Sequence, residues 1–495
     1  MILIAYATAS LLTLAILLTP FRITRYGRFL SILSIAHAGI YLGITIFALT
    51  RLSLPTFFLS SHYLFIDPLA IYEVLIASVI FLLAAFYARG YVRSLLRAGE
   101  IHRENVKFFY AAFNLLLTVT LFAFFSNNLA LFWILVELTT ILSATLIVTL
   151  NAKENILAAL KYVFIASSAM LFSFIGLLLI FAMTRQTLGT GTLNWNELLA
   201  QATTLPTSLF TLAFVFVFIG FAAKAGIVPF HTWLPPAHAK APSVISALLS
   251  AVLLNLGIYG ILRLYAIAHQ TPALHAISLL LIIFGVATIT IATFSMLSRE
   301  NIKKLIAFSS IEHMGLMILG IGLGTPVVLF WVLFHTLGHA LIKSLLFFSA
   351  GILHQQFGSN KYYDMKNVLN LQPLASAGII LGGVAIIGTP MFPMFFSKLY
   401  ILAGLGEFSK PLLLYVLLLL LIVAASFAVF ITRTCCQGNE NGDESNEGDA
   451  PKHYHVALSM KMPIIALMVL ILALGFFFPH GLSNMLSNIV TSLGF

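Results

Sequence analysis

The sequence predicts an all-α polytopic membrane protein of about fourteen transmembrane helices, arranged as two inverted five-helix repeats that each contain one broken helix. The 495-residue chain is 60% hydrophobic and only 8% charged. Apolar runs of about 20 residues, each long enough to cross a hydrocarbon core, recur from end to end. The runs are continuous and do not alternate with polar residues, which excludes a transmembrane β-barrel.

The apolar runs give one predicted helix each. The first run carries no basic n-region and no good cleavage site, so we interpret it as a membrane helix and not as a removed signal peptide. The predicted helices cover residues 2–19, 29–50, 64–88, 107–125, 129–150, 155–182, 207–229, 242–265, 273–296, 301–322, 326–352, 374–404, 411–433 and 458–478.

The loops between these helices predict the orientation in the membrane. The odd-numbered loops carry most of the basic residues: Arg22, Arg25, Arg28, Arg89, Arg93, Arg97, Arg103, Lys107, Lys153, Lys240, Arg299, Lys303, Lys304, Lys361, Lys366, Arg433 and Lys452. The even-numbered loops hold only Arg51, Arg185, Arg263 and Lys410. The positive-inside rule therefore predicts a multi-pass protein of the inner (plasma) membrane with both termini outside, and it explains the net charge of +10 without a nucleic-acid partner.

Two of the predicted helices are interrupted, and each carries a lysine near the break. Lys224 precedes Gly226 and Pro229, in a stretch that continues through an aromatic, proline-rich turn. Lys398 follows Gly388 and two prolines in the helix 374–404. A lysine inside a membrane is costly, and non-helical backbone at that depth is tolerated only inside protein or beside a wet cavity, so both breaks indicate parts of an ion path.

Paired interruptions at corresponding positions are typical of an internal repeat. We therefore divide the chain into N-terminal helices 1–3 (1–106), a first repeat of helices 4–8 (107–265), a second repeat of helices 9–13 (266–433), and an acidic loop with helix 14 (434–495). An odd number of helices in each unit predicts opposite membrane topology for the two repeats.

Glu137 lies in the middle of the predicted helix 129–150 with no compensating charge near it in the sequence, and it is a candidate partner for Lys224 across the bundle. Burial raises the proton affinity of a carboxylate and lowers that of a lysine, whereas pairing does the reverse to both. A Glu–Lys contact that forms and breaks therefore gives a lysine two proton affinities. A protonated glutamate hydrogen-bonded to a neighbouring helix is the structural alternative. Lys161, one or two turns inside the membrane, is a secondary candidate.

His335, His339 and Lys343 are spaced four residues apart and therefore form one stripe on a helix face. Imidazoles exchange protons near neutral pH, so the stripe fits a proton relay. A metal or haem site and an ordinary buried polar stripe are the alternatives, and no convincing carboxylate or thiol partner for a metal is evident. Further polar residues that are candidates for secondary roles are Ser309, Ser310, Glu312, His313, His231 and His238.

Several classes of activity lack their sequence motifs. The chain contains no Gly-rich phosphate loop, no Walker motif and no dinucleotide fingerprint, so we expect no binding of NADH or ATP. Its two adjacent cysteines, Cys435 and Cys436, cannot hold an iron–sulfur cluster alone. The sequence predicts no cofactor and no metal site in this chain.

Several segments point to one family: Lys224 with VPFHTWLPPAHAKAPSVISALLSAVLLN, Glu137 behind FW, FSSIEHMG, HALIKSLLFF, and Lys398 after a broken helix. Together they resemble the antiporter-like proton-translocating subunits of respiratory complex I, membrane-bound hydrogenases and Mrp-type antiporters. The SALLSAVLLN form looks most like the hydrogenase-4-type F subunits. The resemblance implies a central polar axis made of Glu137, Lys224, the His335/His339/Lys343 stripe and Lys398. The helix-8 position departs from many complex I members, because Asn255 stands there and an asparagine cannot titrate.

The resemblance implies a proton-translocating membrane subunit, without redox centres of its own, in a redox-driven complex of the NADH:quinone oxidoreductase or hydrogenase type. Other membrane subunits of that complex would be its partners. One alternative is a subunit of a cation/proton antiporter, with Na⁺ as a second ion, or of an inorganic-carbon uptake complex without a redox partner. An alternative of another class is a haem-bearing quinol enzyme that uses His335 or His339.

Overall fold

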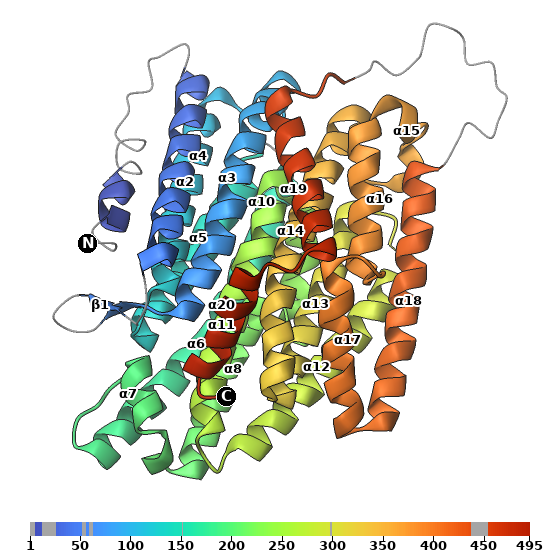
Figure 1. The fold of residues 1–495 in the computed structure, drawn as a ribbon. Coiled ribbons are helices and arrows are strands. Elements are labelled where there is room, and N and C mark those ends of the chain that lie inside the picture. The colour runs from blue at the N-terminus through green and yellow to red at the C-terminus, as the bar shows by residue number, and fades with distance from the viewer. Residues whose placement is uncertain are drawn as a thin grey trace, which may run out of the picture.

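The computed structural model describes residues 5–11, 26–51, 56–58, 63–150, 152–297, 299–436 and 454–495. Within these ranges the protein is a helical bundle, as predicted, with one short hairpin that was not predicted. Figure 1 shows α2 to α5 on one side of the bundle, α16 to α18 on the other, and α10, α11 and α14 between them. The predicted first helix (2–19) lies largely outside the described residues, and the acidic segment 438–450 lies entirely outside them.

Twelve helices among the described residues are long and apolar enough to cross a membrane. Two of these spans combine several elements. The helices of the bundle are α2 (Tyr26–Arg51), α3 (Pro68–Arg97), α4 (Arg103–Phe124), α5 (Leu129–Val148), α6 (Lys153–Leu188), α8 (Thr207–Ala225), α9 (Leu234–Lys240), α10 (Ser243–Leu248), α11 (Leu254–His269), α12 (Leu274–Met296), α13 (Ile302–Leu323), α14 (Pro326–Phe357), α16 (Pro373–Ile387), α17 (Pro393–Phe408), α18 (Lys410–Cys435) and α19 (Leu458–Phe476).

Shorter elements lie at the ends of the bundle. The strands β1 (Thr56–Phe58) and β2 (Leu64–Ile66) form an antiparallel hairpin in which Thr56 faces Ile66. The short elements α7 (Trp195–Ala200), η1 (Ala202–Thr204), η2 (Phe230–Trp233), η4 (Tyr362–Asp364) and α15 (Val368–Leu371) lie in connections, and α20 (His480–Ser492) follows α19. None of these was predicted, because each is too short or too polar to stand out as an apolar run.

Both predicted breaks are present. Helix α8 ends at Ala225, and Gly226 takes the left-handed conformation with φ 73°. Helix α16 ends at Ile387, and Gly388 has φ 91° before α17 begins at Pro393. Glycine adopts this backbone region without the steric cost that a Cβ atom brings.

The proline-rich turn predicted after the first break is wrong in part. Residues 230–240 form the 3₁₀ turn η2 and the helix α9. Pro235 and Pro236 stand in the first turn of α9, where a missing N–H leaves no helical hydrogen bond unmade. The membrane span consequently continues past the break to Lys240. The sequence had predicted a helix that ends at residue 229 and a loop that contains Lys240.

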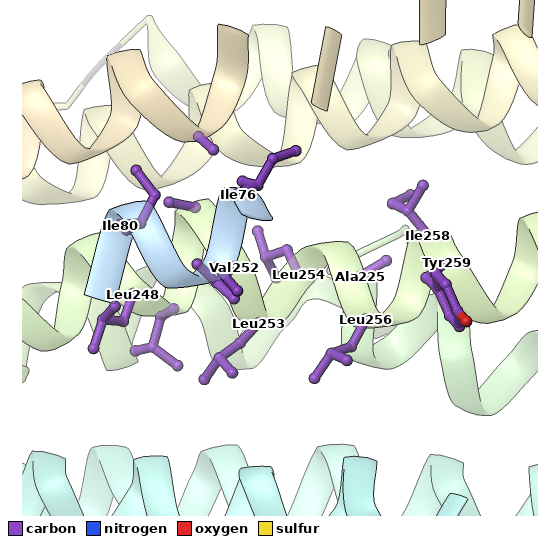
Figure 2. Close-up of a cluster of buried hydrophobic side chains, with 14 of the residues drawn as sticks. Ile76, Ile80, Ala225, Leu248, Val252, Leu253, Leu254, Leu256, Ile258 and Tyr259 are labelled. Carbon is purple, nitrogen blue, oxygen red and sulfur yellow. The ribbon is translucent and has the colours of Figure 1, made fainter. Parts of the chain in front are cut away.

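The centre of the bundle is the span formed by α10, the π-turn η3 (Leu249–Leu253) and α11. The most apolar 18-residue stretch of this span is completely buried inside the protein. Figure 2 shows part of its packing, where Ile76 and Ile80 of α3 gather with Val252, Leu253 and Leu254. Helices α3, α8, α13 and α14 also contact this span, so side chains on it can reach several helices at once.

Candidate functional site

A buried charge contact joins α13 to α17. Lys398 Nζ lies 3.5 Å from Glu312 Oε1, and both side chains are almost completely buried. The lysine also donates to the carbonyls of Ile386 and Ile387, at 3.2 Å each. These carbonyls end α16 at the break, where the helix dipole favours a cation. The break therefore supplies half of the binding site for the Lys398 ammonium group.

A row of imidazoles continues from this pair. His313 Nδ1 lies 2.9 Å from His335 Nε2, and His335 Nδ1 lies 2.9 Å from Ser397 Oγ. At its other end, His313 Nε2 lies 3.3 Å from Glu312 Oε2. All four side chains are buried. The row links α13, α14 and α17 through side chains that can both donate and accept protons.

The contact between His313 and Glu312 is close but is not a formed hydrogen bond. His313 Nε2 and Glu312 Oε2 are both buried without a hydrogen-bond partner, although they lie 3.3 Å apart. Each imidazole of the row can donate or accept at either ring nitrogen, depending on its tautomer. A proton shared at this contact would satisfy both buried atoms.

His339 and Lys343 complete the predicted stripe on α14, and both are fully buried. Lys343 Nζ donates to the Ile306 carbonyl at 2.9 Å and to Ser309 Oγ. Neither ring nitrogen of His339 has a hydrogen-bond partner, although its ring centroid lies 5.5 Å from that of His313. The stripe therefore faces the α13 patch, and Ser310 of that patch bonds Ser250 of the π-turn at 2.8 Å.

Lys224 occupies the other break and is 1% exposed. Its Nζ donates to Thr140 Oγ1 at 2.9 Å and to the Tyr162 hydroxyl at 3.4 Å. No salt bridge joins it to Glu137, whose carboxylate instead accepts a bond from Ser167. One oxygen of Glu137 is buried without a partner. Lys224 therefore bonds Thr140, one helical turn after Glu137, while Glu137 bonds Ser167, and the predicted pair is not in direct contact.

The secondary candidates fall in different places. Lys161 is exposed on the outer surface of α6, away from the axis. His231 is half-buried in η2. His238 is fully buried and stacks on Phe347 of α14, with ring centroids 4.8 Å apart and both nitrogens unpartnered. Asn255 is 1% exposed on α11, and its amide has no well-formed hydrogen bond.

A cavity of about 420 Å³ opens near the end of α14 and the loop between α3 and α4. Glu100, Lys303 and His354 line it, and His354 Nε2 lies 3.5 Å from Glu100 Oε2. Lys303 is buried and interacts electrostatically with Glu100 and with His238. His238 interacts in turn with Lys343. Lys303 donates to the Ala241 carbonyl and both His238 nitrogens lack a partner, so these groups interact with the stripe on α14 through charge and not through hydrogen bonds.

The sequence reading underrated three acidic residues. Glu312 was treated as one member of a hydrogen-bonded patch, but it is the direct partner of Lys398. Asp67 was not singled out from the sequence as a candidate site residue, and Arg263 was placed in an even-numbered loop. Instead they form a buried ion pair with each other, with two contacts of 2.6 Å. Glu73 lies buried beside Asn255. Only the spacing of Asp67 and Glu73 along α3 could have indicated that both face α11, because their partners Arg263 and Asn255 are almost 200 residues away in the sequence.

The described part of the chain contains no cluster of three or more His, Cys, Asp or Glu side chains that could hold a metal ion. The histidines on α13 and α14 contact one another and polar neighbours instead. An all-helical membrane bundle with interrupted helices and buried lysine, glutamate and histidine side chains defines the class of antiporter-like membrane subunits.

The chain belongs to the NADH:quinone oxidoreductase/Mrp antiporter transmembrane family, whose sequence profile matches residues 126–432. This result confirms the predicted resemblance. A hydrogenase-4 component F homolog of Methylacidiphilum infernorum is 29% identical over 420 residues, which are 84% of this chain and 86% of the relative. The NADH-quinone oxidoreductase subunit N of Desulforudis audaxviator is 28% identical over 433 residues, 86% of this chain and 83% of the relative.

Solved structures share the fold. A chain in the Mrp complex from Dietzia sp. superposes with a TM-score of 0.82 at 18% identity, covering 99% of this chain and 98% of that one. A chain in respiratory complex I from Thermus thermophilus gives a TM-score of 0.81 at 19% identity and covers 100% of both chains. These structural neighbours are subunits of multi-subunit membrane complexes.

Proposed function

We propose that this chain is the proton-translocating membrane subunit of a redox-driven complex, of the complex I or group 4 hydrogenase type, and that it has no redox centre of its own. The observation that carries the proposal is the buried Glu312–Lys398 pair at a helix break, joined to the His313–His335 row. Buried charges in a membrane are costly and mark ion paths. The names of the curated relatives, hydrogenase-4 component F homolog and NADH-quinone oxidoreductase subunit N, support the redox-driven assignment.

In this proposal, protons reach the axis from the cavity lined by Glu100, Lys303 and His354. His238 and Lys343 receive them in turn, and the imidazoles of His339, His335 and His313 pass them along the stripe. Lys398 holds its proton while Glu312 is ionised. It releases the proton when Glu312 becomes neutral, because an unpaired buried ammonium is unstable.

The first half of the axis works in the same way through Glu137 and Lys224. Thr140 and Tyr162 now hold the Lys224 ammonium group. A shift of Glu137 towards Lys224 would replace a neutral partner by a charged one and raise the proton affinity of the lysine. A charge change in a neighbouring subunit would drive this shift, so the axis would couple electron transfer in partner subunits to proton movement here.

The positions of the two acid–lysine sets support two inverted repeats over 107–265 and 266–433. Glu137 and Glu312 lie on the second helix of each proposed unit, and Lys224 and Lys398 lie beside the break in the fourth. We also propose that both termini lie outside the inner membrane, on the basis of the loop charges. To test this orientation, Cys435 and Cys436 are replaced and a single cysteine is introduced near residue 495. Labelling of that cysteine in sealed cells by a reagent that does not cross the membrane would place the C-terminus outside.

The partner complex decides between a redox-driven pump and the antiporter alternative. The test is purification of the chain from native membranes in mild detergent, followed by mass spectrometry of the proteins that accompany it. Hydrogenase or quinone-reductase subunits support the proposal. Small antiporter subunits, or a soluble carbon-uptake partner without redox centres, overturn the redox assignment and leave the proton path to be tested. A visible spectrum of the same preparation excludes the haem-bearing alternative if it shows no haem bands from this chain.

The proton path itself is tested by Glu137→Gln in the native complex. Loss of proton uptake into inverted vesicles, with the complex still assembled, is the expected result. Coupled proton transfer that survives intact in this variant refutes the role of the first half of the axis.

A further inference from the structure

A polar stripe on α11 lies outside the proposed axis. Asn255, Tyr259 and Arg263 are spaced four residues apart and therefore share one face of the helix. All three are buried. Opposite them, α3 presents Asp67 at its N-cap and Glu73 six residues further on. Two antiparallel helices thus face each other with polar residues over about two helical turns, although both lie in an apolar bundle.

The contacts follow one another along this face. Asp67 accepts two hydrogen bonds of 2.6 Å from Arg263. Arg263 donates a third, of 2.9 Å, to the Tyr259 hydroxyl. Tyr259 interacts electrostatically with Glu73, and the Glu73 carboxylate faces the Asn255 amide. Tyr259 donates its own hydroxyl hydrogen to the Phe124 carbonyl at 2.8 Å. Direct hydrogen bonds therefore join Asp67, Arg263 and Tyr259, and the step from Tyr259 to Glu73 is electrostatic.

The outer end of the stripe borders on open space. One cavity of about 810 Å³ is lined by Asp67, by neighbouring residues of α3 and by α20. A second cavity of about 400 Å³ is lined by Asp67, Arg263 and Trp195. Asp67 lines both cavities and Arg263 lines the smaller one, so the ion pair lies at their boundary. The guanidinium Nε atom is buried without a partner, so the pair retains an unused donor.

The inner end of the stripe reaches the level of the imidazole row. Tyr72, next to Glu73, donates to the Leu333 carbonyl of α14 at 2.7 Å, two residues before His335. Beyond Glu73, the face of α3 turns apolar, with Ile76 and Ile80 packed in the cluster of Figure 2. Glu73 is thus the innermost titratable side chain on this face of α3. The π-turn η3 ends at Leu253, two residues before Asn255, and such turns occur frequently at functional sites.

We propose that Glu73, and not Asn255, carries the titratable proton where α3 faces α11. The stripe of Tyr259, Arg263 and Asp67 connects Glu73 to water at the end of the bundle where α3 begins. Glu73 is 4% exposed and stands beside an asparagine with two unpartnered polar atoms. A carboxyl group can hold and release a proton there, whereas the amide cannot. The inference rests on the proposed proton translocation and adds an access route to it.

The experiment compares four variants in the native complex, with proton uptake into inverted membrane vesicles followed by a pH-sensitive dye. Glu73→Gln keeps the shape of the side chain and removes the titratable group, so we expect proton uptake to fall at least tenfold. Glu73→Asp should retain most of it. In the double variant Glu73→Gln/Asn255→Asp the carboxyl group moves to the facing side chain, and we expect uptake to recover at least threefold over Glu73→Gln. Glu104→Gln, an exposed position on α4, is the matched control and should be unchanged.

The rescue separates a proton-carrying role from a structural one, because a second substitution would not repair a packing defect. Full uptake in Glu73→Gln, or a double variant no better than the single one, overturns the inference. Should Glu73→Gln not accumulate, the double variant and Glu73→Asp still decide between the two outcomes. Glu312→Gln is measured in parallel. If proton uptake survives in both Glu73→Gln and Glu312→Gln, the proposed function is refuted. If uptake survives in Glu73→Gln but is lost in Glu312→Gln, only the present inference is refuted.

Discussion

Lys398 is held between a carboxylate on α13 and the carbonyl end of α16, with Glu312 Oε1 3.5 Å from its Nζ atom. The two parts of this site differ in character. The carbonyls of Ile386 and Ile387 are fixed by the helix break, whereas Glu312 also lies 3.3 Å from His313 Nε2 and can gain or lose a proton. Lys398 therefore has one set of constant partners and one partner whose charge can change.

The first prediction concerns Glu312. We expect Glu312→Gln to lower proton uptake at least tenfold and to destabilise the protein by about 3–5 kcal/mol if Lys398 stays charged, because one partner of a buried pair is removed. Glu407→Gln, an exposed glutamate on α17, is the control. The measurements are dye-monitored proton uptake and thermal unfolding of the solubilised complex. Unchanged uptake in Glu312→Gln would contradict the proposed role of the pair.

The second prediction concerns Lys224 and the hydroxyl that holds it. Lys224→Gln should abolish proton uptake, since no group at that break could then carry charge. Thr140→Val removes the 2.9 Å hydrogen bond but leaves the lysine, so we expect a several-fold loss only. Lys461→Gln, an exposed lysine on α19, is the matched control. Equal losses in Thr140→Val and Lys224→Gln would show that the effect is structural. The readout is the initial rate of uptake in inverted vesicles.

The third prediction concerns the second break. A Cβ atom on Gly388 would lie 3.0 Å from Lys398 Cδ and would stand on a residue with φ 91°. We expect Gly388→Ala to cost about 1–2 kcal/mol of stability through the left-handed backbone and to lower uptake by displacing Lys398. Gly43→Ala, in α2 with nothing within 4 Å, should be neutral or stabilising by about 0.5–1 kcal/mol. Thermal unfolding of both variants gives the comparison.

The fourth prediction concerns pH. The hydrogen bond from His354 lowers the pKa of Glu100 below its usual value, and Lys303 acts in the same direction, while burial opposes both. A carboxyl group whose folded pKa is lowered stabilises the fold above its unfolded pKa of about 4.3, and this contribution is lost as the pH falls through the folded pKa. Because the pair is partly exposed, we expect it to contribute no more than about 1 kcal/mol.

The measurement is the unfolding midpoint of wild type and Glu100→Gln at pH 7 and near pH 3. The variant should be less stable at pH 7, and the difference should shrink at the lower pH. A difference that is independent of pH would mean that Glu100 acts through packing and not through its charge. Tyr91 and Lys240 also line this cavity, so Lys240→Gln is a useful control for the general effect of charge there.

Local sequence predicted the features that depend on local chemistry. Gly226 and Gly388 end their helices as expected, because a left-handed residue is required and glycine supplies it. The stripe of His335, His339 and Lys343 is buried on one face, as its spacing predicted. The helix ends were less accurate. Helix α3 continues to Arg97, nine residues past the predicted end. The length of an apolar run indicates only the part of a helix that lies in the hydrocarbon core, and the helix can extend beyond that core.

The partners of the charged residues could not be predicted from the sequence. Glu312 and Lys398 are 86 residues apart, and Asp67 and Arg263 are 196 apart. Nothing in the local sequence distinguishes an acidic residue that meets a lysine from one that bonds a hydroxyl, as Glu137 does with Ser167. Which contact forms depends on how α5, α6 and α8 pack, and the side-chain spacing on a single helix carries no information about this.

The complete enclosure of α10, η3 and α11 has a consequence for biogenesis. Helices α13 and α14, which cover one side of this span, are synthesised after it. Until they arrive, Ser250 would face lipid without its partner Ser310, and the covering helices would be missing around Asn255. A chain that stops before α12 would hold these polar groups in hydrocarbon. The first half of the protein therefore depends on the second half to cover the polar groups of its central span.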